Sequence, residues 1–499
     1  MVWLTVVGVV LVLLVVVVVY DLTQKRHAIL RNFPVVGHFR YILEWMGPEL
    51  RQYIVTDNDE ERPFSRDQRR WVYASAKGQN PHFGFGTDSD QNDSQYPLIR
   101  QATFPYMPTG EGASNALPSA KIMGEWRERT SAFRPASVVN ISAMSFGSLS
   151  SAAIESLNRG ASQAGCLHNT GEGGISRYHR QGGDLIFQIG TGYFGARKDG
   201  RFSIDAMLAS MEGAPVKAIE IKLSQGAKPG LGGVLPAAKV TREVAEARGV
   251  PVGITVRSPA RHTEFDSVGS MVEFIERIAD ASGLPVGIKS AVGQRTFWAE
   301  LAQHMTETGR GPDFISIDGS EGGTGAAPLA FSDHVSLPFR TGFAEVYGTF
   351  ARQGIHKNIT WIGAGRLGFP AQSLLAMALG CDLINVGREA MLAIGCIQAQ
   401  KCHTGHCPTG VATQQKRLVR GLDATDKAVR AGRYVEALRH DILRLSHACG
   451  EAHPALVSGE AIELVCGDNR LENLWEHYGY EASWQSSETM RPLLSDLMP

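Results

Sequence analysis

The chain has 499 residues, more than one hydrophobic core usually holds, so we expect one large domain with attached segments. Its formal net charge is −1 and it has no basic stripe, which excludes nucleic acid as an expected partner. The seven cysteines are an odd number and three are clustered, which indicates a reducing compartment rather than a disulfide framework.

An uncharged run opens the chain. The residues from Val2 to Val19 are almost all valine and leucine, and as a helix they reach about 27 Å, close to the roughly 30 Å hydrocarbon core of a bilayer. A cleaved signal peptide is the alternative, but the run lacks the positive start and the small-residue cleavage site of such a peptide. Basic residues follow the run (Lys25, Arg26, Arg31) and none precedes it. The positive-inside rule therefore predicts a single-pass membrane anchor, residues 1–20, with the body of the protein facing the cytoplasm.

The next region, residues 21–134, shows little periodicity, and we interpret it as a lead-in that packs on the main domain. From residue 135 short apolar runs alternate with helical stretches, which predicts βαβ units and a parallel sheet. Residues 135–415 have the usual size of a (β/α)8 barrel, so the predicted fold class is α/β, a TIM barrel. Nine runs compete for eight strands, and we expect Val252–Val256 to be the extra one. The runs are Val138–Ser142, Cys166–Asn169, Leu185–Ile189, Ala218–Lys222, Val252–Val256, Val286–Ser290, Phe314–Asp318, Thr360–Gly363 and Leu383–Val386.

The last segment, residues 416–499, is predicted to be a helical extension that covers the end of the barrel. Its clearest helix is Ala424–Leu445, and its two thiols, Cys449 and Cys466, are expected to be buried.

Polar and glycine-rich groups follow the predicted strands, where barrels collect their functional residues. Gly365-Arg366 and Gly387-Arg388 follow strands seven and eight, the loops that habitually bind phosphate in this fold. Glycine lets backbone N–H groups approach phosphate oxygens, and arginine adds a bidentate contact. A phosphate-bearing cofactor is therefore expected.

Three cysteines follow the last predicted strand with the spacing C-x5-C-x4-C, at Cys396, Cys402 and Cys407, and Pro408 comes next. Thiolates select iron–sulfur clusters or zinc, and a proline after the last ligand is typical of ferredoxin loops. Three thiolates favour a three-iron cluster. The alternatives are a zinc site completed by His403 or His406, and three structural cysteines.

A lysine at a strand end also suits a Schiff base, as in an aldolase, but an aldolase gives no role to a cysteine cluster. A redox cluster beside a barrel is explained if the barrel holds a redox cofactor, and flavin mononucleotide (FMN) has a single phosphate.

Six motifs extend the argument beyond composition and spacing. With them, residues 135–415 resemble the FMN-binding synthase domain of glutamate synthases. The motifs, in family order, are AMSFGSLS (143–150), HNTGEGG (168–174), IKLSQGAKPGLGGVLP (221–236), SPARH (258–262), DGSEGGTGAAPL (318–329) and CIQAQKCHTGHCPTGVATQ (396–414).

The resemblance implies a role for each matching residue. Backbone groups of Ala143, Met144 and Ser145 would contact the flavin ring, with Gln188 and Lys289 at its polar edge. Gly322, Gly323 and Thr324 would border the flavin, and Gly365, Arg366, Gly387 and Arg388 would hold its phosphate. Cys396, Cys402 and Cys407 would bind a [3Fe–4S] cluster that passes electrons to FMN. Lys222, Gln225 and Lys228 would receive 2-oxoglutarate, and Glu172 would link the ammonia-entry loop to the site.

The chain also departs from the family. It has no amidotransferase segment beginning with a catalytic cysteine, so ammonia is expected from outside the chain, free or from a separate partner. It has no second cysteine set and no dinucleotide fingerprint, so the electron donor is expected to be external, ferredoxin-like or a reductase. Arg366 and Arg388 stand where the family has less charged patterns, which leaves the details of FMN binding open.

The sequence thus predicts an oxidoreductase of the EC 1.4 class that reductively aminates 2-oxoglutarate, through 2-iminoglutarate, to glutamate. Two alternatives stay open. One is related redox chemistry on an N-substituted glutamate, and the other is a non-catalytic, membrane-tethered redox-sensing module.

Overall fold

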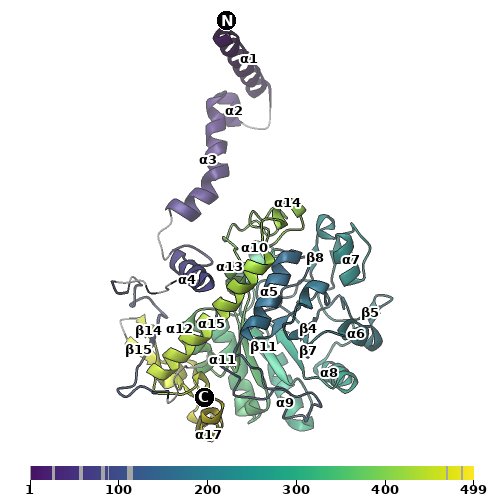
Figure 1. The fold of residues 1–499 in the computed structure, drawn as a ribbon, viewed down its shortest axis with the longest axis vertical. Helices are drawn as coiled ribbons and strands as arrows, with labels where there is room; N and C mark the ends of the chain where they lie inside the picture. The colour runs from purple at the N-terminus through teal and green to yellow at the C-terminus, as the bar shows by residue number, and fades with distance from the viewer. Residues whose placement is uncertain are drawn as a thin grey trace. The chain divides into compact units, whose positions relative to one another are not determined.

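The computed structural model describes residues 2–24, 28–55, 60–79, 82, 85–87, 89–108, 116–467, 470–484 and 487–498 (Figure 1). The chain divides into two compact units, Met1–Arg69 and Arg70–Pro499, which are described separately.

The first unit is helical, with α1 (Val2–Thr23), α2 (Ala28–Asn32), α3 (Val36–Leu50) and a π-helical turn (Arg51–Val55). Helix α1 is long and apolar enough to cross a membrane by length and composition, a criterion that a signal sequence also meets. Two of the charges behind the predicted orientation, Lys25 and Arg26, lie outside the described residues. The buried carboxylate of Asp21 accepts hydrogen bonds from the Val35 N–H (2.9 Å) and from His38 Nε2 (2.9 Å), so α1 is tied to the start of α3.

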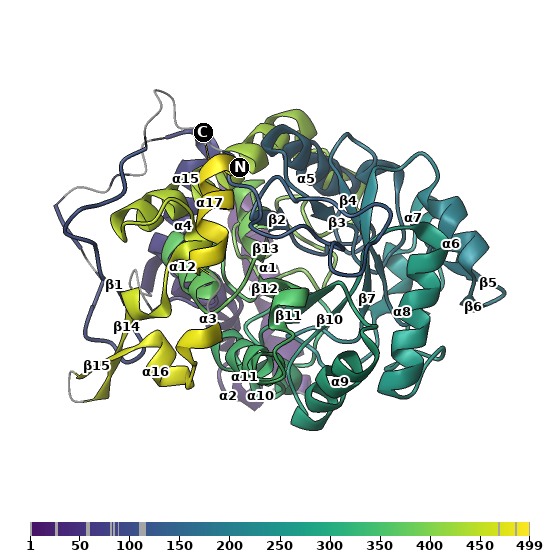
Figure 2. The same cartoon turned by 90° about the horizontal axis from the view of Figure 1, so that it is seen from below.

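The second unit is built on a closed barrel of eight parallel strands, as predicted (Figure 2). Around the ring the strands are β2 (Val139–Ile141), β3 (His168–Asn169), β4 (Leu185–Ile189), β7 (Val216–Lys222), β10 (Val286–Ser290), β11 (Phe314–Asp318), β12 (Thr360–Ala364) and β13 (Leu383–Val386). The ninth run is outside the barrel, as expected, because β9 (Val256–Arg257) pairs antiparallel with β8 (Val234–Leu235).

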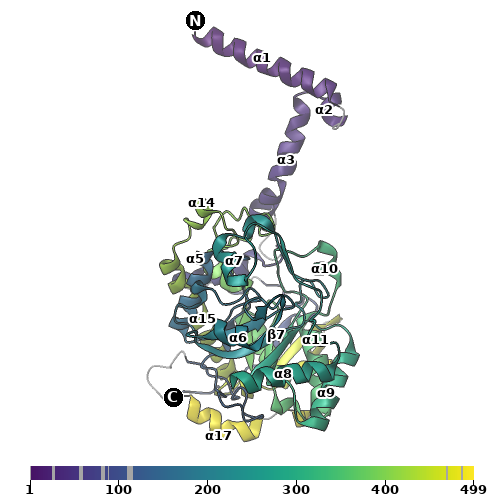
Figure 3. The ribbon, with the colours of Figure 1, turned by 90° about the vertical axis from the view of Figure 1, so that its right-hand side faces the viewer.

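Helices surround the barrel, and the sequence marks where many of them start and stop. Side chains of Ser150, Thr241 and Ser267 cap helix starts, while Gly165 and Gly283 end helices in the left-handed conformation that glycine adopts without steric cost. The helices that follow the barrel strands along the chain are α5 (Ser151–Ala164), α6 (Ile204–Met211), α7 (Arg242–Arg248), α8 (Val268–Ser282), α9 (Arg295–Thr308), α10 (Leu329–His334), α11 (Phe339–Arg352), α12 (Pro370–Ala378) and α13 (Arg388–Ala393). Figure 3 shows α7 and α10 at one end of the barrel and α9 at the other.

The end of the barrel at which the strands begin is closed by the segment 116–134. Met123 and Phe133 exchange backbone hydrogen bonds (2.8 and 3.2 Å), and Met123 is buried against side chains from the barrel strands and their approaches. Those side chains are Leu167, Ile186, Ala218, Phe314, Ile362 and Leu383.

Buried ion pairs hold this plug in place. Arg129 contacts Asp313 (Nε to Oδ2, 2.9 Å) and Glu276 (Nη1 to Oε2, 2.8 Å), and Lys121 contacts Asp382 (3.0 Å). Asp313 also accepts the N–H of Val286 (2.8 Å), at the start of β10. The ion pairs therefore join the plug to the first residues of the strands.

The C-terminal extension is mostly helical, with α14 (Lys416–Val419), α15 (Ala424–Ala448), α16 (Leu474–Tyr478) and α17 (Ser487–Leu497). Helix α15 lies along α5 (Figure 1). The two helices pack so closely that a side chain at Gly160 would meet Ala431 Cβ at 2.5 Å. The extension also holds two strands that the sequence analysis missed. In this sheet, β1 (Pro97–Ile99) of the lead-in pairs with β14 (Ile462–Cys466), which pairs with β15 (Arg470–Asn473). The expectation of buried thiols is corrected too, because Cys449 and Cys466 are both only half-buried.

Candidate active site

One cavity of about 680 Å³ opens at the end of the barrel where the strands finish. Every residue predicted from the sequence for cofactor or substrate contact lines it, together with one of the three clustered cysteines. The predicted residues are Ala143, Met144, Ser145, Glu172, Gln188, Lys222, Gln225, Lys228, Lys289, Gly322, Gly323, Thr324, Gly365, Arg366, Gly387 and Arg388, and the cysteine is Cys402.

Two lysines and a carboxylate meet on one wall of this cavity. Lys222 lies at the end of β7, and its Nζ contacts Glu172 Oε2 (3.1 Å) and donates to Gln225 Oε1 (2.7 Å). Lys228 is buried, and its Nζ donates to the carbonyl of Gly232 (3.3 Å). Burial and the nearby charge of Lys222 hold the pKa of Lys228 below its ordinary value.

Glu172 is ionised in this arrangement. Burial by itself raises the pKa of its carboxyl group, but the positive charges of Lys222, Lys228 and Arg248 act against it and hold that pKa below the ordinary value. Glu172 therefore pairs with Lys222 as a carboxylate on this wall.

A second anionic group lies inside the barrel and was not singled out from the sequence. Glu220 of β7 is fully buried and accepts hydrogen bonds from the amides of Gln188 (2.7 Å) and Asn169 (2.8 Å) and from the hydroxyl of Ser316 (2.7 Å). The predicted cofactor contact Gln188 is thus held by a neighbour on the next strand. A charged residue between two isoleucines of a buried strand was the available signal.

Lys289, at the end of β10, is buried and its Nζ contacts Asp318 Oδ2 (3.3 Å). Burial lowers the pKa of Lys289, but the charges of Asp318 and Glu220 outweigh it and raise that pKa above the ordinary value. Asp318 also accepts the N–H of Gly226 (3.1 Å), so it joins β11 to the loop that carries Lys228.

The segment SPARH supports the lysine wall from behind. His262 donates from Nε2 to the carbonyl of Lys222 (2.9 Å), and its Nδ1 accepts from the hydroxyl of Tyr193 (3.0 Å). The tyrosine oxygen in turn accepts the backbone N–H groups of Thr263 and Glu264. This chain fixes the end of β7, from which Lys222 projects.

The glycine and arginine loops form the opposite side of the cavity. Gly365 has φ of 141° and Arg366 has φ of 56°, so the backbone turns sharply as β12 ends. The Arg388 guanidinium donates to the carbonyl of Glu321, and a side chain at Gly323 would meet Arg388 Cδ at 2.4 Å. A side chain at position 323 would therefore displace Arg388.

The cysteine loop lies directly beside the glycine loop, since a side chain at Gly325 would meet Cys402 Cβ at 3.1 Å. Cys396 and Cys402 are half-buried and Cys407 is buried. The Sγ of Cys396 accepts the N–H of Gln398 (3.4 Å). Burial raises the pKa of Cys407, but hydrogen bonds from Ala412 and Thr409 act against it and hold that pKa below the ordinary value.

Two further contacts place this loop. Tyr73 donates to the carbonyl of Cys396 (2.8 Å), and Lys239 donates from Nζ to the carbonyl of Cys402 (3.0 Å). Lys239 also lines the cavity, a position that the sequence analysis missed because nothing in the spacing linked it to the cysteines.

The three sulfur atoms do not converge on one point. Among the described residues, they do not belong to any set of ligand atoms within 4.8 Å of one another. Sulfur atoms around one tetrahedral zinc ion are about 3.8 Å apart, from a Zn–S bond of about 2.3 Å. The loop is therefore too open for a single zinc ion as it stands.

Comparison with known proteins matches this site to a family. Residues 118–452, about two thirds of the chain, match the conserved region in glutamate synthase. The chain belongs to the glutamate synthase family. This family places it among the oxidoreductases that act on CH–NH2 donors.

Glutamate synthase relatives differ in how much of their length the chain covers. It is 38% identical over 491 residues to the glutamate synthase large subunit-like protein YerD of Bacillus subtilis, covering 91% of this chain and 93% of YerD. It is 38% identical over 315 residues to the archaeal-type glutamate synthase [NADPH] of Thermotoga neapolitana, covering 62% of this chain and 59% of that protein. Among solved structures it is similar to a mandelate oxidase, with a TM-score of 0.41, 15% identity, and coverage of 78% of this chain and 86% of that one.

Proposed function

We propose that this protein is an FMN- and iron–sulfur-dependent oxidoreductase that reductively aminates 2-oxoglutarate to glutamate. Ammonia comes from outside the chain, and electrons come from an external donor, ferredoxin-like or a reductase. One observation carries the proposal. A single cavity brings a pair of lysines, two glycine–arginine strand ends and one of the three clustered cysteines together.

The lysine wall suits a dicarboxylate. Lys222 and Lys228 add two positive charges to a partly enclosed site, and Gln225 adds an amide. A carboxylate that replaces Glu172 or Gln225 on Lys222 gains a charge-assisted hydrogen bond. Because Glu172 is ionised and paired, the role we propose for it is to hold Lys222 in place, with Tyr193 and His262 fixing the strand end below.

The other side of the cavity fits FMN. Gly322, Gly323 and Gly365 line this side, where glycine lets backbone groups approach a ligand, and Arg366 and Arg388 provide cations for one phosphate. Gln188 and Lys289 are held by Glu220 and Asp318, so their positions are fixed for contact with the flavin. FMN supplies two-electron redox chemistry when it is bound.

The cysteine loop supplies three thiolates, the number that a three-iron cluster with one cysteine on each iron requires. N–H groups directed at Cys396 and Cys407 stabilise thiolates, as hydrogen bonds to the sulfurs do in iron–sulfur proteins. We therefore assign Cys396, Cys402 and Cys407 to a [3Fe–4S] cluster. Because Cys402 lies beside Gly325, electrons would have a short path from that cluster to the cavity.

We further propose that residues 1–20 anchor the protein in a membrane as a single pass, with the body, from the lead-in 21–134 through the barrel 135–415 to the extension 416–499, in the cytoplasm. The support is the length and apolar composition of α1. None of the most apolar 18-residue stretch of this helix is buried against the rest of the protein. Labelling of engineered cysteines on each side of α1 in intact cells checks the orientation, and release of soluble, shortened protein would overturn the anchor.

The proposed activity is tested on anaerobically purified protein without α1. Bound FMN is reduced with dithionite and mixed with 2-oxoglutarate and ammonium, and its reoxidation is followed by absorption. We expect reoxidation with both compounds and glutamate as the product. Reoxidation by an amine without ammonium would favour an N-substituted glutamate, and no reoxidation with any keto acid and ammonium would favour the redox-sensing module.

The cofactors are tested separately by absorption and low-temperature electron paramagnetic resonance (EPR). A flavin band with an oxidised three-iron signal supports both assignments. Flavin without that signal would remove the cluster and the electron entry route with it, while absence of FMN after cluster reconstitution would remove the proposed activity.

A further inference from the structure

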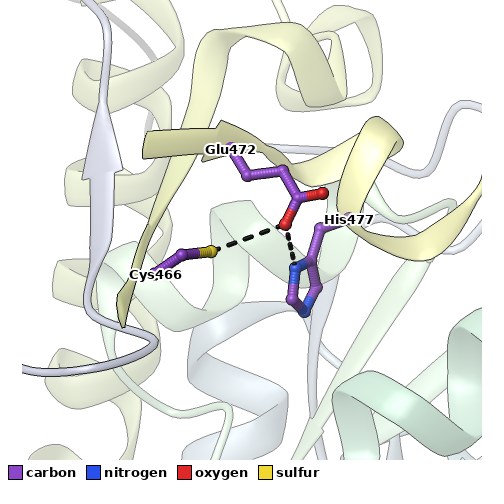
Figure 4. Close-up of side chains that lie close together, drawn as sticks. All are labelled: Cys466, Glu472 and His477. Carbon is purple, nitrogen blue, oxygen red and sulfur yellow. Dashed lines mark hydrogen bonds and ion pairs between the residues drawn. The ribbon is translucent and has the colours of Figure 1, made fainter. Parts of the chain in front are cut away.

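A second group of metal-ligating side chains lies in the C-terminal extension, and none of its members lines the active-site cavity. It consists of Cys466 at the end of β14, Glu472 on β15 and His477 on α16 (Figure 4). Each residue offers one ligand atom, and all three atoms lie within 4.8 Å of one another. Among the described residues, this is the one such group of three or more histidine, cysteine or carboxylate ligands.

The carboxylate of Glu472 is the centre of the group. Its Oε2 atom lies 3.4 Å from Cys466 Sγ and 2.7 Å from His477 Nδ1. In the β14–β15 ladder Glu472 is opposite Leu464, so Glu472 and Cys466 lie on the same face, two positions apart along the strand. Helix α16 follows β15 directly and turns His477 toward them, as Figure 4 shows.

These separations are close to those around a tetrahedral zinc ion. With Zn–S of about 2.3 Å and Zn–O and Zn–N of about 2.0–2.1 Å, neighbouring ligand atoms are roughly 3.3–3.6 Å apart. The Cys466–Glu472 distance already falls in that range, and the Glu472–His477 distance needs to open by about 0.6 Å. All three side chains are half-buried, so a metal ion reaches them without unfolding.

The ligand types also select the metal. A thiolate, an imidazole and a carboxylate together suit zinc, whereas calcium and magnesium take oxygen ligands alone. We propose that Cys466, Glu472 and His477 bind one zinc ion, with water in the fourth position. The site is independent of the active-site cavity and of the proposed function.

Zinc binding replaces two hydrogen bonds with three metal–ligand bonds. The Cys466 thiol loses its proton to solvent, and the neutral imidazole of His477 binds through Nδ1 as the tautomer that carries its single proton on Nε2. No electron transfer is involved. Arg470 lies opposite Cys466 in the ladder. The ion joins β14, β15 and α16 and so secures the sheet that also holds β1 of the lead-in.

The site is tested on the folded holoprotein, with zinc measured by mass spectrometry after equilibration with a zinc-buffering chelator. We expect about one zinc ion per chain, in addition to the iron of the proposed cluster. The Cys466→Ser and His477→Gln variants should bind zinc at least tenfold more weakly, as loss of a ligand requires. Cys449→Ser is the matched control, a half-buried thiol of the same extension, and should bind zinc like the wild type.

A fourth variant separates the two cysteine sites. Cys402→Ser should lose the cluster signal and keep the zinc. Zinc that persists in Cys466→Ser and His477→Gln, or that disappears in Cys402→Ser, would overturn the proposal, as would a wild type that binds none. A folding control is included, since at one fixed zinc concentration the thermal midpoint should rise more for the wild type and for Cys449→Ser than for His477→Gln.

Discussion

The two ends of the barrel use the same kind of interaction for different purposes. At the end where strands begin, Arg129 of the plug 116–134 is buried in contact with Asp313 and Glu276, and the plug fills the space. At the end where strands finish, Lys222 and Glu172 are also paired, but they face a cavity of about 680 Å³. Charge alone therefore does not identify the site. What distinguishes the site is that its ion pair lines a cavity.

The largest effect is expected at the closed end. The Asp313→Asn substitution leaves Arg127 and Arg129 buried without their shared countercharge, so it should reduce the free energy of unfolding by about 3–5 kcal/mol. Urea unfolding measures the change, and activity per folded molecule should stay the same. Asp426→Asn, which removes half-exposed ion pairs, is the control and should cost less than about 1 kcal/mol. Equal losses in the two variants would contradict the assigned role of Asp313.

The reverse pattern is expected at the open end. Lys222→Met removes a cation of the cavity, so kcat/KM for 2-oxoglutarate should fall about 10²–10³-fold. The free energy of unfolding should fall by less than in Asp313→Asn, because Glu172 keeps the favourable charges of Lys228 and Arg248. Steady-state kinetics measures kcat/KM, and urea unfolding measures the free energy of unfolding. A stability loss as large as that of Asp313→Asn would remove the distinction between the ends.

Acid should unfold the protein through its buried histidines. His453 donates to the carbonyl of Pro118 in the plug (2.9 Å) and accepts the N–H of Ala455, and burial lowers the pKa of His453 from 6.5 to about 4. Between these values the unfolded chain binds a proton that the folded chain does not. This histidine's contribution is therefore complete above about pH 6.5 and lost as the pH falls, by about 3 kcal/mol at pH 4.

Unfolding free energies measured at several pH values check this. Because burial also lowers the pKa of His179, near the cavity, to about 4, the test is the difference between the wild type and His453→Gln. The variant should show a weaker decline between pH 6.5 and 4. Identical slopes would show that His453 is protonated in the folded state.

The smallest effect comes from one added methyl group at each end. Gly323→Ala places Cβ 2.4 Å from Arg388 Cδ, so it should weaken FMN binding about tenfold by moving that arginine. Gly124→Ala, in the plug, has φ of 86° and places Cβ 2.8 Å from Pro285, so it should cost about 1 kcal/mol of stability without changing FMN affinity. Flavin fluorescence titration and thermal unfolding separate the two results.

Local patterns were enough to predict the barrel. Strands Leu185–Ile189, Val286–Ser290, Phe314–Asp318 and Leu383–Val386 have the predicted bounds, because each is an apolar run ended by a polar residue or a glycine. The sheet of the extension was missed for a physical reason. Its strand Pro97–Ile99 has three residues and its partner lies far along the chain, so no local pattern marks it.

The site was predictable to the extent that its residues follow strands or carry a motif, as Lys222 and Gly323 do. Glu220 and Asp318 were not assigned roles, although they hold Gln188 and Lys289 in place. Their function depends on which strands are neighbours around the ring, and that is a property of the closed barrel rather than of any single run of residues. Lys239 was missed for the same reason, since its contact is with a loop more than 160 positions away.

The pairing of β1 with β14 also bears on how the protein is made. Residues 100–461 separate the two strands, and at about 5–20 residues per second a ribosome needs roughly 20–70 s to synthesise them. Throughout that time the backbone groups of Pro97–Ile99 have no strand to pair with, so the lead-in is completed only when the last tenth of the chain emerges. The matched region ends at residue 452. A fragment that ends there would contain the whole barrel but would lack β14, the strand with which β1 pairs.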